Sequence, residues 1–324
     1  GVRTDINSFT NGGSNPLSTL SPRISFSYHL NPKWDINASV GTYFKIPPYT
    51  ALGYLDNFGN ALNKNLDYIQ STHYVLGTQF LPKTDLRFTF EAFYKRYSNY
   101  LVSVNNGISL ANQGAEYTSF GSEPLLSVGD GRTYGFEVFA QQKLINKLFY
   151  VASYSYVVSK FSGADGRFIS SSWDNRHLLS FTLGYKLRRN WDLGLKYRYA
   201  GGTPYTPFDL TASQLNYLSL GTGVLNFNQL NSQRLGAFNQ LDFRVDKRIN
   251  FKRTAVNFYV DIQNILKAKN DDIPKYTFQR TSDNSNFLTT DGQAVKSDGS
   301  NAIPYILNTS SGNLIPSLGV IFEF

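Results

Sequence analysis

The sequence predicts an all-β fold, a transmembrane antiparallel β-barrel with about twelve strands present. Three observations predict it. Segments of about ten residues alternate apolar and polar side chains, very short turns alternate with long polar loops, and the chain closes on an alternating strand that ends in Phe324. Strands of this length cross a membrane at the usual tilt. A soluble sandwich has similar strands, but it has no reason to place all its long loops at one end.

Five predicted hairpins supply ten of the strands. A strand over residues 1–7 and the terminal strand complete the twelve. Trp34 and Trp191 each follow a short turn, where an aromatic girdle places amphipathic rings at headgroup level. The short turns lie at Asn31-Pro32-Lys33, Pro82-Lys83, Asn146-Lys147, Arg189-Asn190 and near Asn250.

The opposite ends of the strands are joined by long loops, which are uncommon in compact domains unless they carry function. Their polar composition, rich in Asn, Tyr and Ser, suits adaptable hydrogen bonding and stacking. The predicted loops cover residues 8–21, 46–69, 101–130, 161–173, 202–235 and 266–313.

The terminal strand has an apolar face made by Leu318, Val320, Phe322 and Phe324. A bare apolar edge strand of a soluble protein invites aggregation. A closed barrel in lipid has no such edge. The ending therefore favours a membrane barrel over the edge strand of a soluble sandwich.

Composition supports this class. Aromatic residues make up 15 % of the chain and charged residues 17 %, and no apolar run is long enough for a spanning helix. The net charge of +8 is spread along the chain without a basic cluster, so nucleic acid is not an expected partner. The absence of Cys argues against a disulfide framework. The absence of Met, with Gly at position 1, indicates that a leader and further sequence precede Gly1.

Several segments occur in an order and spacing that resemble the C-terminal barrel portion of TonB-dependent outer-membrane receptors, particularly the Bacteroidetes type. They are Ser21-Pro22-Arg23-Ile24-Ser25, Lys45-Ile46-Pro47-Pro48-Tyr49, Thr72-His73-Tyr74-Val75-Leu76-Gly77, Glu91-Ala92-Phe93-Tyr94-Lys95, Tyr97-Ser98-Asn99-Tyr100, Tyr134-Gly135-Phe136-Glu137-Val138, Trp173-Asp174-Asn175-Arg176-His177 and Gly201-Gly202-Thr203-Pro204-Tyr205-Thr206-Pro207.

The resemblance implies that residues 1–324 form a single domain, the C-terminal part of a 22-stranded barrel that is filled by an N-terminal plug. The plug and the first ten strands would then be absent from this chain. A closed barrel of twelve strands is the alternative, since bacterial barrels use even strand numbers from eight upward.

The resemblance further implies a multi-pass barrel of the bacterial outer membrane that imports a scarce large nutrient of the siderophore, vitamin, glycan or peptide class. Its expected partners are the TonB complex through the plug, the barrel-assembly machinery through Leu318, Val320, Phe322 and Phe324, lipopolysaccharide with outer-membrane lipid, and a surface lipoprotein. The alternatives are a passive porin-like channel and a structural or adhesion barrel.

Ligand capture is expected in the long loops. The alternative for these side chains is that aromatic residues anchor the rim in the membrane interface, and that Asp174, Arg176 and His177 form an ion cluster facing lipopolysaccharide. The candidate ligand-binding residues are Tyr49, Tyr54, Trp173, Arg176, Tyr205 and Tyr217.

Charged residues on the second face of the strands are expected to face the lumen. They either line a channel or bind the plug, because buried charges need partners. Their mixed signs favour the plug. They are Asp35, Arg87, Glu91, Glu137, Lys196, Arg198, Asp242, Arg244 and Asp261.

No catalytic constellation is recognisable. The three His lie on different strands without the spacing of metal ligands, and no phosphate-binding loop precedes a helix. Neither an enzyme nor a metal or other cofactor is therefore expected.

Overall fold

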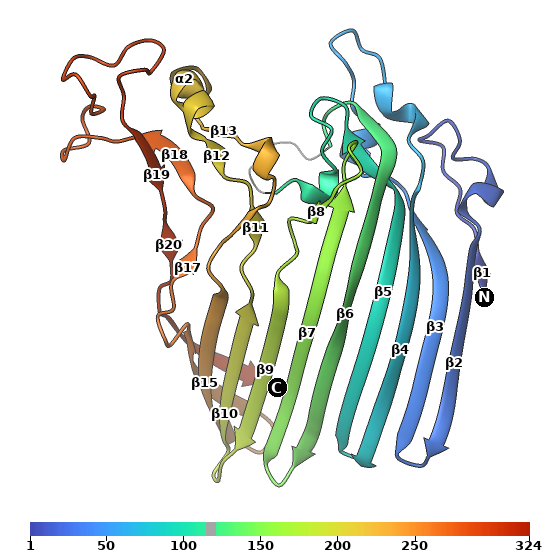
Figure 1. The fold of residues 1–324 in the computed structure, drawn as a ribbon. Coiled ribbons are helices and arrows are strands. Elements are labelled where there is room, and N and C mark those ends of the chain that lie inside the picture. The colour runs from blue at the N-terminus through green and yellow to red at the C-terminus, as the bar shows by residue number, and fades with distance from the viewer. Residues whose placement is uncertain (115–120) are drawn as a thin grey trace.

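The computed structural model describes residues 1–114 and 121–324 and contains a 13-stranded antiparallel sheet (Figure 1). Twelve strands follow one path, as the sequence predicts, and one short strand, β8 (Phe168–Ser170), pairs with β7 beside it. The path is β1 (Val2–Arg3), β2 (Ser21–Asn31), β3 (Trp34–Lys45), β4 (Ile69–Lys83), β5 (Leu86–Ser103), β6 (Leu125–Ile145), β7 (Leu148–Ser162), β9 (Arg176–Lys186), β10 (Trp191–Ala200), β15 (Phe238–Asn250), β16 (Ala255–Gln263) and β21 (Ile315–Glu323).

The remaining elements belong to the long loops, which gather at one end of the sheet while the short turns lie at the other (Figure 1). Among the described residues, no helix is sufficiently long and apolar for a membrane span. The helices are α1 (Tyr49–Leu52), α2 (Leu210–Leu220), and the 3-10 turns η1 (Pro16–Thr19), η2 (Leu62–Asn65), η3 (Leu110–Asn112) and η4 (Phe227–Gln229). The short strand pairs are β11 (Pro204–Tyr205) with β14 (Gln233–Arg234), β12 (Phe208–Asp209) with β13 (Val224–Leu225), β17 (Asn270–Asp271) with β20 (Ser310–Ser311), and β18 (Lys275–Phe278) with β19 (Pro304–Leu307).

Two of the short turns have the left-handed backbone that suits tight hairpins. Asn146 and Lys147 have φ of 48° and 73°, and Arg189 and Asn190 have φ of 60° and 57°. Positive φ at both central residues matches the twist of the flanking strands. The predicted turn at Pro82-Lys83 is wrong, because β4 continues through Lys83 after an irregularity in its register with β5.

Two other expectations need correction. The strand predicted over residues 1–7 is reduced to Val2–Arg3, because the backbone N–H of Asp5 donates to the hydroxyl of Thr19 and leaves the sheet. Strands β5 and β6 have 18 and 21 residues, well above the expected length of about ten. Their ends pair within the predicted loop 101–130, part of which, residues 115–120, lies outside the described residues.

The strand register separates an apolar face from a charged face. On the apolar face, Trp34, Phe80 and Phe88 stack across β3, β4 and β5 near the short turns, with centroids 4.3 and 6.4 Å apart. Nearer the long loops, the rings of Tyr74, Tyr94 and Tyr134 form a second row at 6.4 Å spacing. Two aromatic rows at the borders of an apolar band are typical of a membrane barrel.

The terminal strand β21 pairs with β16 through nine residues and presents its apolar side chains outward. Leu318 and Phe322 are 79 % and 63 % exposed, and Val320 and Phe324 are also exposed. These side chains continue the apolar face, because Val320 is the partner of Phe258 and Leu318 that of Val260.

The buried core lies under the long loops. Ala51, Leu52, Leu101 and Leu110 are almost fully buried in one cluster. The buried side chain of Asn63 ties this cluster together, since its amide donates to the carbonyls of Ala51 and Glu123 and its oxygen accepts from the N–H of Leu125. Packing and hydrogen bonds therefore give these loops a defined shape.

Candidate functional site

Helix α2 (Leu210–Leu220) lies within the predicted loop 202–235. The Asp209 side chain caps its first turn by accepting from the N–H of Ala212 at 2.9 Å. Gly221 ends it in the left-handed conformation, with φ of 68°, and donates to the carbonyl of Tyr217. An Asp N-cap and a terminal Gly are recognisable helix signals, so the sequence contained a signal for this helix.

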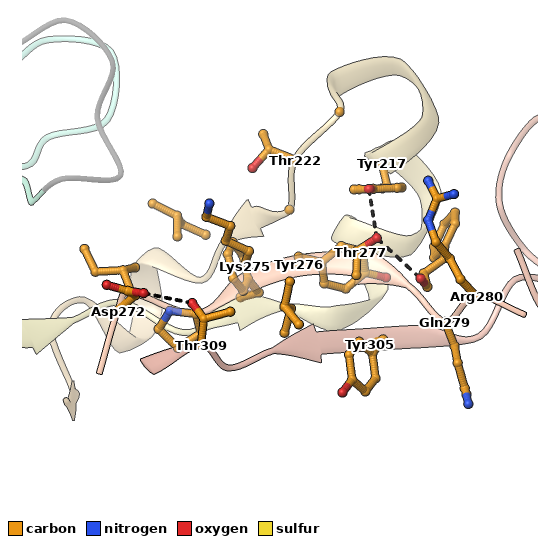
Figure 2. Close-up of a pocket in the computed structure, with 18 of the residues that line it drawn as sticks. Tyr217, Thr222, Asp272, Lys275, Tyr276, Thr277, Gln279, Arg280, Tyr305 and Thr309 are labelled. Carbon is orange, nitrogen blue, oxygen red and sulfur yellow. Dashed lines mark hydrogen bonds between the residues drawn. The ribbon is translucent and has the colours of Figure 1, made fainter. Parts of the chain in front are cut away.

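The hairpin of β18 and β19 lies beside α2 and comes from the last long loop. Gln214 on α2 donates to the carbonyls of Ser300 and Ala302 at 3.2 and 2.9 Å. A cavity of about 1450 Å³ lies between the segments around α2 and this hairpin (Figure 2). Two loops that are far apart in the sequence therefore build one concave site, which we call the loop cavity.

Aromatic rings form one wall of the loop cavity. The ring of Tyr217 lies 4.8 Å from Phe278 and 5.6 Å from Tyr276, both in edge-on contact. Its hydroxyl lies 3.0 Å from that of Thr277, as Figure 2 shows. Phe278 is fully buried, so these rings form a small core that positions the wall.

The polar groups of the loop cavity differ in whether they already have partners. Asp272 accepts from the hydroxyl of Thr309 at 3.1 Å, and Asp271 accepts from the N–H of Gly236 at 3.0 Å. The hydroxyl of Tyr276 is buried without a hydrogen-bond partner among the described residues, and burial raises the pKa of this phenol. Lys275 is exposed and makes no ion pair with a described residue.

Tyr217 alone among the six predicted ligand-binding residues lines the loop cavity. The other five lie elsewhere at the long-loop end. Tyr49 on α1 is 65 % exposed and meets Phe9 edge-on, and Trp173 meets Phe161 in the same way. Tyr54 follows α1, Tyr205 belongs to β11, and Arg176 opens β9.

Arg176 belongs to a buried ion cluster. Its guanidinium lies 3.1 Å from the carboxylate of Asp174, and that of Arg234 lies 2.8 Å from the same oxygen. Asp174 is fully buried and also accepts from the N–H of Ser159 at 3.0 Å. This cluster joins segments around Ser159, Asp174 and Arg234, and it pairs the charge of Arg176 with a carboxylate of the protein itself.

All nine charged residues predicted to face the lumen lie on the charged face of the sheet, as their register shows. On β10 and β15 they are paired, since Arg198 lies 3.4 Å from Asp242 and Arg244 2.8 Å from Asp246. On β5 and β6, Glu91 and Glu137 stand directly opposite each other. Like charges in this arrangement repel.

Each of the remaining charged candidates lies beside a side chain of opposite charge or an aromatic ring. Asp35 lies 2.5 Å from His29 and accepts from the amide of Gln79 at 3.1 Å. Lys196 is the cross-strand partner of Asp242, and Asp261 that of Arg244. Arg87 lies over the ring of Phe139. Within residues 1–114 and 121–324, no group of three or more His, Asp or Glu side chains is arranged to hold a metal ion.

Comparison with known families identifies this architecture. The family described as TonB dependent receptor-like, beta-barrel, matches residues 1–265. The chain belongs to this family. Barrels of the family lie in the outer membrane, so this receptor barrel is an outer-membrane β-barrel, and the family is one of transport receptors and not of enzymes. No curated protein sequence matches the receptor barrel.

Solved structures share the fold. The ferric-catecholate import receptor Fiu from E. coli K12 aligns with a TM-score of 0.56 and 12 % identity over 93 % of this chain and 35 % of its own. The siderophore receptor PiuA from Acinetobacter baumannii gives 0.56 and 15 % over 94 % and 36 %. The ferric citrate transporter FecA gives 0.56 and 15 % over 94 % and 38 %. The receptor barrel thus spans little more than a third of each.

Proposed function

We propose that residues 1–324 form the C-terminal part of the barrel of an active transporter that imports a scarce large nutrient across the outer membrane. The observation that carries the proposal is the twelve-strand path with every long loop at one end, in a chain matched by the TonB-dependent receptor family over residues 1–265. The ligand would be a siderophore, a vitamin, a glycan or a peptide. We also propose the Bacteroidetes type, on the residue segments that resemble it.

The partners follow from this role. An N-terminal plug inside a 22-stranded barrel would contact TonB and bind the charged face. The mixed signs of Glu137, Lys196, Arg198 and Asp261 suit such docking better than a strongly charge-selective pore. The barrel-assembly machinery would bind β21, lipopolysaccharide would surround the barrel, and a surface lipoprotein would cover the long loops.

The loop cavity would collect the nutrient. Its aromatic wall offers stacking, and Lys275 and the Tyr276 hydroxyl offer donors that no described residue uses. Tyr49, Tyr54, Trp173, Arg176 and Tyr205 remain proposed contacts at the same end of the barrel, in addition to Tyr217.

Uptake in living cells tests the transport proposal. Cells that express the full-length receptor are offered candidate nutrients, with and without an uncoupler that removes the proton gradient. Active transport requires that uptake stop in the presence of the uncoupler, and that it also stop in cells without TonB. Uptake that continues under both conditions supports the passive channel, and surface binding without uptake supports the adhesion barrel.

A further inference from the structure

Three cations stand side by side on the apolar face of the receptor barrel. Arg96 on β5 is the direct partner of Arg132 on β6, and Arg132 is the direct partner of Lys160 on β7. They share the face of Tyr94 and Tyr134, because each arginine follows or precedes its tyrosine by two residues along the same strand. We call these three residues the cation row.

The position of the cation row along the strands is defined by the tyrosine row below it. Tyr74, Tyr94 and Tyr134 form the border of the apolar band nearest the long loops. Such rings lie at headgroup level in a membrane. The cation row lies one step further toward the long loops, about 7 Å along the strand at roughly 3.3 Å per residue. It therefore lies at the level of lipid headgroups and not of acyl chains.

The cation row has no counter-ion within the described part of the chain. Arg96, Arg132 and Lys160 form no ion pair within 4.0 Å with a described carboxylate. Asp130 is the acid two residues from Arg132 on the same face, and it too forms no ion pair with a described residue. The guanidinium of Arg132 lies 4.4 Å from the ring centre of Phe168 on β8.

Three arginines on the charged face are arranged differently, whereas Arg23 and Arg87 of that face lie over the rings of Tyr43 and Phe139. Arg198, Arg244 and Arg248 each have a carboxylate within 3.4 Å, supplied by Asp242, Asp246 and Glu323. Three adjacent cations directly opposite one another repel, which costs stability unless an anion lies between them. The repulsion in the cation row therefore indicates an external counter-ion.

We propose that Arg96, Arg132 and Lys160 form a binding site for the phosphate groups of anionic lipid headgroups in the leaflet beside the long loops. Guanidinium groups bind phosphate oxygens through paired, charge-assisted hydrogen bonds, and a Lys ammonium adds a point charge. A doubly charged phosphate at this position neutralises the row. The inference deepens the lipopolysaccharide contact of the proposed function and depends on its outer-membrane setting, but not on nutrient transport.

Lipid binding by the full-length receptor tests the site. The receptor is reconstituted in phosphatidylcholine vesicles that contain either phosphorylated lipid A or lipid A from which the phosphates have been removed, and the bound lipid A is measured by native mass spectrometry. The wild-type receptor is expected to retain the phosphorylated form about tenfold more strongly. The triple variant Arg96→Ala, Arg132→Ala, Lys160→Ala is expected to lose this preference.

A matched variant controls for total charge. Lys33→Ala, Lys143→Ala, Arg188→Ala removes three exposed cations near the short turns and is expected to keep the preference. Equal retention of both lipids by the wild-type receptor overturns the proposal, as does a preference that survives in the triple variant. If equimolar inorganic phosphate releases the bound lipid A, the site binds free phosphate and not a lipid headgroup, and the proposal is overturned.

Two further readouts separate folding and transport from lipid binding. If the triple variant does not insert, the wild-type comparison of the two lipids alone decides the proposal. Uptake is measured on the same proteins, with and without the proton gradient. A wild-type receptor that shows no phosphate preference but normal gradient-dependent uptake overturns the lipid site alone. A wild-type receptor that shows the preference but no such uptake overturns the transport proposal alone.

Discussion

Asp174 and Arg234 are joined by an ion pair of 2.8 Å, although 60 residues separate them in the sequence. The carboxylate of Asp174 is fully buried and also receives Arg176. The pair joins the segment that leads into β9 to the loop that contains α2. It therefore links the wall of the barrel to the segment that carries the loop cavity.

Asp174→Asn keeps the shape of the side chain and removes its charge, which leaves two partly buried guanidinium groups without their counter-charge. We expect it to lower the free energy of unfolding by about 3 kcal/mol. Urea unfolding of the folded receptor in detergent measures the change. Asp165→Asn is the control, since its pair with Arg167 is exposed and should contribute less than about 1 kcal/mol. Equal effects of the two substitutions would contradict a special role for Asp174.

Gly184 is covered by the ring of its cross-strand partner Phe149, and an added Cβ would lie 1.9 Å from that ring. Gly184→Val should therefore displace the ring and lower the free energy of unfolding by about 1–3 kcal/mol. Gly194 lies directly opposite Gly184 on β10, and a Cβ added there would lie 3.7 Å from the nearest atom, the Cβ of Arg244. Gly194→Ala should therefore be tolerated. The unfolding midpoints of the two variants, compared in one detergent, check the difference.

Tyr276→Phe removes a buried hydroxyl that has no partner among the described residues. The receptor without ligand should be as stable as the wild type or slightly more stable, because no hydrogen bond is lost. If the nutrient accepts a hydrogen bond from this group, its affinity should fall by about tenfold. Ligand titration of both proteins measures this. Tyr305→Phe, at an exposed residue of the same cavity, is the control, and unchanged affinity in Tyr276→Phe would exclude the hydroxyl as a contact.

Removal of Phe324 should reduce the amount of folded barrel in the outer membrane, because the resemblance assigns the terminal aromatic to recognition by the barrel-assembly machinery. Phe324 is fully exposed and has no packing partner to lose. Heat-modifiable mobility of the protein in membrane fractions reports folding. Glu323→Gln, which weakens the 2.5 Å pair with Arg248, should leave the amount nearly unchanged. Wild-type levels of the shortened protein would argue against an assembly signal.

Asp283 holds a turn in the last long loop by accepting from the hydroxyls of Thr281 and Ser285, which lowers its pKa from 3.8 to about 2. Because the pKa in the folded turn is the lower one, the stabilisation is complete above pH 3.8 and is lost as the pH falls through 2. Hydrogen exchange of the Ser285 amide should therefore stay slow at pH 3, after correction for the intrinsic rate. Asp283→Asn should remove this pH dependence.

Much of the barrel is readable from the sequence because the signal is local. The dyad repeat assigns each residue of a strand to one of two faces, and a short turn defines the partner of the next strand. The nine charged residues of the second face were predicted in this way. The errors in the strand bounds arise from pairing with a neighbouring strand. Pro82 lies inside a strand, and β5 and β6 extend past the apolar band, because a strand continues as long as its neighbour pairs with it.

Long-range contacts decided the remainder. The loop cavity requires Tyr217 and Tyr276 to meet from two loops, and periodicity contains no information on how loops pack. Only one of the six predicted ligand-binding residues, Tyr217, lines it. The cation row required the register of three strands, which a single strand's alternation does not specify.

The sequence by itself therefore determined the strands, the two faces and the apolar terminal strand, since each follows from neighbours two residues apart. The tertiary structure decided which loop residues meet and which cations stand side by side, since both depend on contacts between segments distant in the chain.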